Sequence, residues 1–302
     1  MTPHLTMIQP SRREAGLAFG ALVLGAMAMA ISPTFVRWAD VGPFTSAFWR
    51  VFLALPALYG WMRLSERGLD RAQAAKASFS PPILLAGLAF TGDLLFWHLS
   101  ILTTSVANAT FFATTAPIWV IVFGWLLLRQ RVGRETLAGL AFCLLGGGAL
   151  LAETLHVRPA GAAGDLEGLA TGVFFGLYFL AVQAARRTTS AARVTFESTV
   201  LTATALFVVA LIAERQMLPR TLGGALALIG MAWISHAGGQ GLLAVALGRL
   251  PATFSSLVIF LEAIAAAAFA YLLLGEPVSR VQALGGLLII VGIYVARPRA
   301  KG

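Results

Sequence analysis

Charge is what this sequence has least of. Only 12% of its 302 residues are Asp, Glu, Lys or Arg, whereas 58% are hydrophobic, and the mean hydropathy is +0.83. A soluble domain carries about 25% charged residues, so too few are present here to cover a water-facing surface. Lipid must therefore cover most of the outside, and the long, continuous apolar runs favour spanning helices over an alternating barrel pattern. The sequence predicts an all-α integral membrane protein.

Cysteine and metal-binding patterns are equally scarce. The one cysteine, Cys143, lies in an apolar run, which excludes an intrachain disulfide. No His or Cys pair has metal-ligand spacing and there is no Walker-type phosphate loop, so we expect no metal, no cofactor and no direct use of ATP. The net charge of +9 comes from short links between apolar runs, which indicates topology rather than a nucleic-acid partner.

Apolar stretches of about 17–26 residues recur along the chain, close to the ~20 that cross a bilayer as a helix. The ten stretches are 15–36, 44–62, 83–102, 107–128, 134–151, 166–185, 196–213, 222–247, 252–274 and 280–296. Ala28-Met29-Ala30 in the first stretch is a pattern that a signal peptidase accepts. The stretch is long for a signal sequence, however, so we expect it to be retained as the first span.

The basic residues predict an orientation. If the N-terminus is cytoplasmic, the links on that side hold sixteen Lys and Arg, the opposite links hold five, and Arg50 lies within a stretch. The excess of positive charge on cytoplasmic links therefore places both termini in the cytoplasm, which agrees with an even number of spans. We expect a bacterial-type inner (plasma) membrane, with membrane lipid as a partner.

The two halves of the chain carry similar patterns in the same order. Trp125-Leu126-Leu127-Leu128 aligns with Tyr271-Leu272-Leu273-Leu274, 146 residues later, and Gly139 and Gly146 align with Gly285 and Gly292. Gly16-Leu17-Ala18-x-Gly20 matches Gly168-Leu169-Ala170-x-Gly172. A repeat of five spans, an odd number, inverts the second copy, and inverted repeats around a binding site are typical of transporters. We predict two inverted five-helix halves, residues 1–151 and 152–302.

The second half carries the more specific motifs. They are Ser255-Ser-Leu-Val-Ile-Phe-Leu-Glu262, then Tyr271-Leu-Leu-Leu-Gly275-Glu276, then Gly285 and Gly292, with a degraded copy in the first half at Ala116-Pro117, Leu128-Arg129-Gln130, Gly139 and Gly146. This pattern, and Arg50 within Trp49-Arg50-Val-Phe-Leu, resembles the EamA domain of the drug/metabolite transporter superfamily. The sequence departs from that pattern at Ala263, where the family has proline, and at Arg129, where it has glycine. The departures leave open any role for the Glu-Pro pair.

The resemblance implies a ten-helix bundle around a central cavity that opens to alternating sides. It implies that spans one, three, four, six, eight and nine line this cavity. It also implies a secondary transporter of small organic solutes, and within the family the chain resembles the YddG-like exporters of aromatic amino acids and methionine. The alternatives are an exporter of another metabolite or drug class, an intramembrane lipid-modifying enzyme or a channel. We expect no enzyme, because no paired-aspartate or His-Glu-x-x-His motif is present.

Three ionisable residues stand out within the apolar stretches: Arg50, Asp93 and Glu262. A charge at the centre of a span costs roughly 2.5–3.5 kcal/mol, so such residues face the bundle interior, water or each other. Arg50 and Asp93 either neutralise each other, cap helix ends, or relay an ion or proton. Glu262 either binds a substrate ammonium, exchanges a proton or hydrogen-bonds to backbone. Asp93 and Glu262 are our candidates for ion coupling.

Mixed aromatic and polar faces suit an amphipathic solute such as an amino acid, since rings stack on its apolar part and polar groups bind its ends. The predicted substrate contacts are Trp97, His98, Asn108, Phe111, Phe112, Thr114, Thr115, Phe175, Tyr178, His236, Gln240 and Glu262. The plainer alternative is that the aromatic residues pack against lipid or other helices, and that His236 is a hydrogen-bonded interior histidine.

Overall fold

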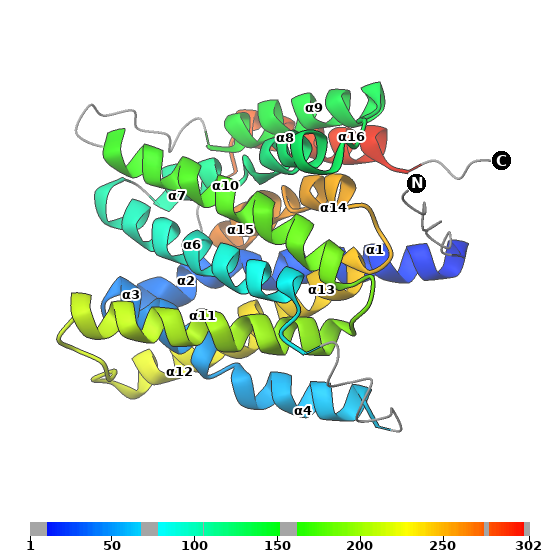
Figure 1. Ribbon diagram of the computed structural model, residues 1–302. Coiled ribbons are helices and arrows are strands. Elements are labelled where there is room, and N and C mark those ends of the chain that lie inside the picture. The colour runs from blue at the N-terminus through cyan, green and yellow to red at the C-terminus, as the bar shows by residue number, and fades with distance from the viewer. Residues whose placement is uncertain (1–10, 68–77, 105, 152–161, 275–277, 299–302) are drawn as a thin grey trace.

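A computed structural model describes residues 11–67, 78–104, 106–151, 162–274 and 278–298, and all regular structure in these ranges is helical (Figure 1). The elements are α1 (Arg12–Ala30), α2 (Ser32–Trp38), α3 (Pro43–Phe52), α4 (Leu55–Ser65), α6 (Pro81–Thr103), α7 (Val106–Ala113), α8 (Ala116–Leu128), α9 (Arg134–Leu151), α10 (Ala162–Ala185), α11 (Ala191–Ala213), α12 (Leu222–Gly230), the π-helix η2 (Met231–Gln240), α13 (Gly241–Leu247), α14 (Ala252–Val258), α15 (Leu261–Leu274) and α16 (Arg280–Ala296).

Seven helical segments in the described part of the chain are long and apolar enough to cross a membrane. They are Arg12–Trp38, Pro81–Thr103, Phe111–Leu128, Ala163–Ala185, Ala191–Ala213, Leu222–Leu247 and Ala252–Phe269. The chain is therefore an all-helical integral membrane protein. Helices also cover the other three predicted stretches, as α3 with α4, α9 and the shorter α16. The count of ten spans remains a prediction.

Several of the long segments are interrupted near their middle. Pro33, Pro56 and Pro117 lie in the first turns of α2, α4 and α8, where the N–H that proline lacks has no helical acceptor anyway. The break between α14 and α15, at Ile259 and Phe260, contains no proline. It lies within one residue of the repeat position of the α7–α8 break at Thr114 and Thr115. The two copies therefore share an interruption, although only the first copy has a proline beside it.

Two equivalent helices, α9 and α16, lie side by side at one edge of the bundle (Figure 1). A Cβ atom at Gly139 would lie 2.6 Å from the carbonyl oxygen of Gly292, and one at Gly146 would lie 2.5 Å from that of Gly285. As the residue number rises along α9, the number of the contacting residue in α16 falls, so the two helices are antiparallel. Between them the thiol of Cys143 donates to the carbonyl of Ile289 across 3.7 Å, and these residues are 146 positions apart. Residues equivalent in the repeat thus touch each other at this interface.

A second antiparallel pair joins α11 to α3 and α4. At one end, the carboxylate of Glu214 accepts hydrogen bonds from the backbone N–H groups of Phe44 (2.7 Å) and Thr45 (3.0 Å), at the start of α3. At the other end, Arg193 forms an ion pair with Glu66 at 2.6 Å. Glu66 and Glu214 lie 148 positions apart, as do Thr45 and Arg193. The same two positions of each copy therefore meet at both ends of this interface. Backbone N–H groups donate to the carboxylate at one end, and an arginine side chain pairs with it at the other.

Asp40 makes the reciprocal cap at the Glu214 end. Its Oδ2 accepts hydrogen bonds from the N–H groups of Arg220 (3.0 Å) and Thr221 (2.7 Å), just before α12. Desolvation raises the pKa of the Asp40 carboxyl, but the hydrogen bonds from Thr221 and Arg220 together outweigh it, so the pKa lies below its usual value. A carboxylate of each half therefore caps a helix of the other half and joins the halves.

Replacing Glu214 with alanine is expected to lower the free energy of unfolding by about 0.5–2 kcal/mol, because two N–H groups at the start of α3 lose their acceptor. Thermal unfolding of the purified protein in detergent measures this. The matched control is Arg215→Ala, at the exposed neighbouring residue, which we expect to leave the melting temperature unchanged. Equal melting temperatures for both variants would show that Glu214 does not clamp the interface.

Candidate functional site

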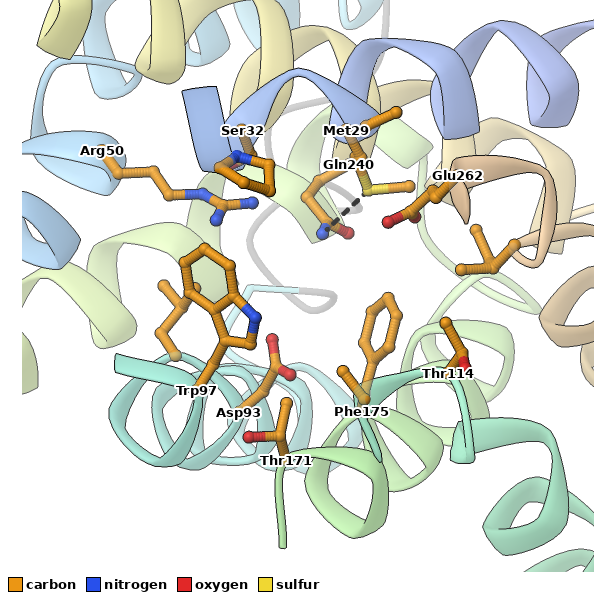
Figure 2. Close-up of a pocket in the computed structure, with 15 residues that line it drawn as sticks. Met29, Ser32, Arg50, Asp93, Trp97, Thr114, Thr171, Phe175, Gln240 and Glu262 are labelled. Carbon is orange, nitrogen blue, oxygen red and sulfur yellow. Dashed lines mark hydrogen bonds between the residues drawn. The ribbon is translucent and has the colours of Figure 1, made fainter. Parts of the chain in front are cut away.

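A central cavity, open at its mouth, lies where the interrupted helices meet (Figure 2). Its walls come from α1, α2, α3, α6, α7, α10, η2, α15 and the breaks next to them. The lining residues are Met29, Ala30, Ser32, Pro33, Arg50, Asp93, Leu94, Trp97, Ala113, Thr114, Thr171, Phe175, Gln240, Ile259 and Glu262. Three helix breaks and the end of the π-helix therefore contribute to a single wall. Interrupted helices in a membrane occur where the freed backbone faces protein or a water-filled space.

The three charged residues singled out from the sequence all reach this cavity. Figure 2 shows the guanidinium of Arg50 and the carboxylates of Asp93 and Glu262 directed toward its centre. Arg50 is 6% exposed and Asp93 8%. Within the described residues, Arg50 has no ion pair within 4.0 Å to either carboxylate, although the three charges interact electrostatically at longer range. Arg50 and Asp93 therefore attract each other without forming a direct ion pair.

Two aromatic rings form the apolar part of the wall. Phe175 of α10 packs edge-on against Phe179, with ring centroids 5.0 Å apart, and stacks on Tyr178 at 6.2 Å. Trp97 of α6 meets the ring of His98 edge-on at 4.9 Å. Because buried neighbours hold both rings, they offer the cavity rigid apolar surfaces on which a solute ring or thioether could pack.

The polar wall residues make hydrogen bonds within the protein. The hydroxyl of Thr114 donates to the carbonyl of Phe111 (2.6 Å), and that of Thr171 donates to the carbonyl of Glu167 (3.2 Å). The amide nitrogen of Gln240 donates to the sulfur of Met29 across 3.3 Å, as the dashed line in Figure 2 marks. The two hydroxyl donors are therefore already engaged, so these side chains can only accept hydrogen bonds from a solute, whereas the Gln240 amide keeps one N–H donor beside its acceptor oxygen.

Of the predicted contacts, Trp97, Thr114, Phe175, Gln240 and Glu262 line the cavity, together with Asp93.

Three other predicted contacts lie behind the wall. Nδ1 of His98 is 2.7 Å from the carbonyl oxygen of Leu94, in its own helix. Nε2 of His236 is 2.9 Å from the hydroxyl of Thr199. Phe90 packs between Tyr178 (4.9 Å) and His236 (5.3 Å). His98, Tyr178 and His236 therefore support the wall and do not line the cavity.

Apart from Thr114, the predicted contacts Phe111, Phe112 and Thr115, on α7 and at its break with α8, fall outside the lining. Phe111 and Phe112 pack against each other with centroids 5.6 Å apart, and the Thr115 hydroxyl donates to the carbonyl of Phe112 across 2.6 Å. Asn108 lies in α7, and its side chain is outside the part of the chain that the structure describes.

Sequence reasoning missed Met29 and Ser32, which line the cavity beside Pro33. A proline within the first apolar stretch was the available signal.

Comparison with known proteins gives a consistent result. A family model described as the EamA-like transporter family matches residues 16–151 and again residues 162–297. An uncharacterized transporter of Archaeoglobus fulgidus is 24% identical over 276 residues, which cover 91% of this chain and 94% of the relative. An uncharacterized transporter of Methanothermobacter thermautotrophicus is 21% identical over 241 residues, covering 77% and 68%. A solved crystal structure aligns with a TM-score of 0.79 at 18% identity, covering 95% of this chain and 98% of the other, and therefore shares the fold.

Proposed function

Because the chain belongs to the EamA-like transporter family, we propose that it is a secondary transporter that carries small organic solutes through the central cavity by alternating access. The observation that supports this proposal is that both matched segments contribute residues to the cavity wall. Arg50, Asp93, Trp97 and neighbouring residues come from the first matched segment, and Thr171, Phe175, Gln240 and Glu262 come from the second. A site between two repeats changes its exposed side when one repeat moves against the other.

The proposed topology is ten spans in two inverted halves, residues 1–151 and 152–302. The antiparallel contact between the equivalent helices α9 and α16 supports the inversion. The start of α1 and the end of α16 lie at the same end of the bundle, which supports an even number of spans (Figure 1). The excess of basic residues on the links at that end favours cytoplasmic termini in a bacterial inner membrane.

The proposed solutes are amino acids, with aromatic amino acids and methionine the leading candidates, moved outward. Cationic and anionic groups face one cavity together with Trp97 and Phe175, which suits a molecule with polar ends and an apolar side chain. Another metabolite or drug class is the alternative, since the wall contains no group specific to one side chain.

Counterflow in proteoliposomes tests this function. Vesicles loaded with unlabelled L-phenylalanine or L-methionine are diluted into the labelled amino acid, with protein-free vesicles as the control. We expect transient, saturable accumulation of label, because a carrier with one alternating site exchanges solute. Flux that rises linearly without saturation would indicate a channel, and conversion of the label into another compound would indicate an enzyme. The absence of any flux across a panel of amino acids, nucleosides and cationic drugs would contradict the proposal.

A further inference from the structure

We propose that Arg50 and Ser32 form an anion-binding end of the cavity, opposite an acceptor end formed by Glu262 and Gln240. A solute would then bind with its negative group at Arg50 and its ammonium group at Glu262. This inference rests on the proposed transport function, and it names the charge pattern that the site selects: a zwitterion, rather than an amine or an acid alone.

Arg50 has the properties of an incomplete anion site. It projects from α3 toward the cavity centre (Figure 2), is 6% exposed, and its Nε has no hydrogen-bond partner in the described part of the chain. A guanidinium has five N–H donors in a planar fork and no acceptor, and it matches a carboxylate in a bidentate manner. A buried cation without a contacting counter-ion is costly, so a carboxylate that enters the cavity gains a preformed partner.

Ser32 adds a second donor on the same side. It lies at the first position of α2, immediately after the break at Ile31 and before Pro33. Its hydroxyl is buried, and Oγ makes no hydrogen bond to any described residue. Figure 2 places Ser32 on the same side of the cavity as the Arg50 guanidinium. The hydroxyl can therefore donate to an anionic group held by Arg50.

The opposite side carries two acceptors that have no donor. Glu262 Oε1 and Gln240 Oε1 are both buried and have no donor within the described segments. The hydrogen bond from Gln240 Nε2 to Met29 (3.3 Å) orients the amide and leaves its oxygen without a donor. In Figure 2 the Glu262 carboxylate lies across the cavity from Arg50, with Asp93 at the base between them. An ammonium group donates up to three hydrogen bonds and accepts none, which matches this end.

The two ends together predict discrimination by charge pattern. A solute with only an ammonium group satisfies Glu262 but leaves Arg50 unpaired. A solute with only a carboxylate is repelled by the carboxylates of Asp93 and Glu262 and leaves Glu262 unpaired. Polar sites reject analogues that lack an expected group more strongly than they reject analogues of different size, because the site's own buried groups remain unpaired. The zwitterion alone completes both ends.

Three probes of similar shape test this: L-phenylalanine, phenethylamine, which lacks the carboxylate, and 3-phenylpropionate, which lacks the ammonium. Binding is measured by thermal stabilisation of purified protein, and inhibition of L-phenylalanine counterflow is measured in proteoliposomes. For the unmodified protein we expect L-phenylalanine to bind about 10- to 100-fold more tightly than either analogue, the range expected for a hydrogen-bonded charged group.

In Arg50→Gln, L-phenylalanine should lose most of that advantage, while phenethylamine binds as well as before or better. Arg50→Lys should retain part of it, since it keeps the charge without the fork. Arg37→Gln, the same change at an exposed arginine of α2, should leave the ranking intact. If Arg50→Gln does not fold, the Lys variant and Ser32→Ala, with a smaller loss for L-phenylalanine alone, carry the test.

The outcomes separate this inference from the proposed function. Counterflow with equal affinity for all three probes, or a loss in Arg50→Gln that is the same for amine and amino acid, overturns the inference and leaves transport standing. No counterflow with any solute class overturns both.

Discussion

Replacing Gly285 with alanine is expected to lower the free energy of unfolding by about 1–3 kcal/mol, whereas the same replacement at Gly286 leaves it almost unchanged. A Cβ atom at Gly285 would lie 2.6 Å from the carbonyl oxygen of Gly146 and 2.8 Å from the backbone nitrogen of Leu150. Both atoms belong to the backbone of α9, so no side-chain rotation relieves the clash and the helices must separate. A Cβ atom at Gly286 would lie 3.9 Å from its nearest neighbour, a side-chain carbon of Ile264.

Thermal unfolding in detergent and size-exclusion chromatography measure this difference. Because the two glycines are adjacent in α16, they share helix propensity, and only the contact with α9 distinguishes them. Gly285→Leu should yield no folded, monodisperse protein, since a branched side chain cannot fit where one methyl group already clashes. Equal melting temperatures for the two alanine variants would mean that α9 and α16 do not pack through these glycines.

Neutralising the coupling carboxylate is expected to abolish the effect of a pH gradient on uptake. Solute exchange should continue in Asp93→Asn, whereas Glu262→Gln should also weaken exchange, because Glu262 is the proposed partner of the solute ammonium. Asp93 and Glu262 both line the cavity, and neither forms an ion pair within 4.0 Å with another described residue. A carboxylate free of a fixed partner can bind a proton on one side of the membrane and release it on the other. Asp93→Asn and Glu262→Gln remove that capacity and preserve the side-chain shape.

Uptake into proteoliposomes is measured for both variants with and without an imposed pH gradient, and counterflow is measured at equal pH on both sides. Glu14→Gln, at the exposed start of α1, is the matched control and should keep the response to the gradient. Unchanged gradient dependence in both cavity variants would remove proton coupling through these residues and leave facilitated exchange.

The parts of the fold that depend on composition could be predicted from the sequence. Long apolar stretches form helices in lipid because no other element satisfies its own backbone there. Arg50, Asp93 and Glu262 could be singled out for the same reason, since a charge in an apolar stretch is too costly to face lipid. All three reach the cavity, which the structure assembles from residues far apart in sequence.

The helix interruptions and the directions of the side chains were harder to predict from the sequence. Pro117 signals the break before α8, but nothing in the sequence marks the break at Ile259 and Phe260, where Ala263 replaces proline. The π-helix η2 is also unmarked. Helix periodicity places His98 beside Trp97, yet only the packing of α6 against α10 decides which of them lines the cavity. Faces of a membrane helix that are apolar all round carry no amphipathic signal, so neighbouring helices determine their direction.

Accessibility of a single cysteine in the cavity wall tests alternating access most directly. In a Cys143→Ala background, Thr114→Cys places one thiol at the α7–α8 break, in the wall of the cavity. A membrane-impermeant thiol reagent is applied to right-side-out and to inside-out vesicles. We expect labelling from both sides, slowed by a bound solute. Labelling from one side only under all conditions, or from neither side, would contradict a cavity that opens alternately to the two faces of the membrane.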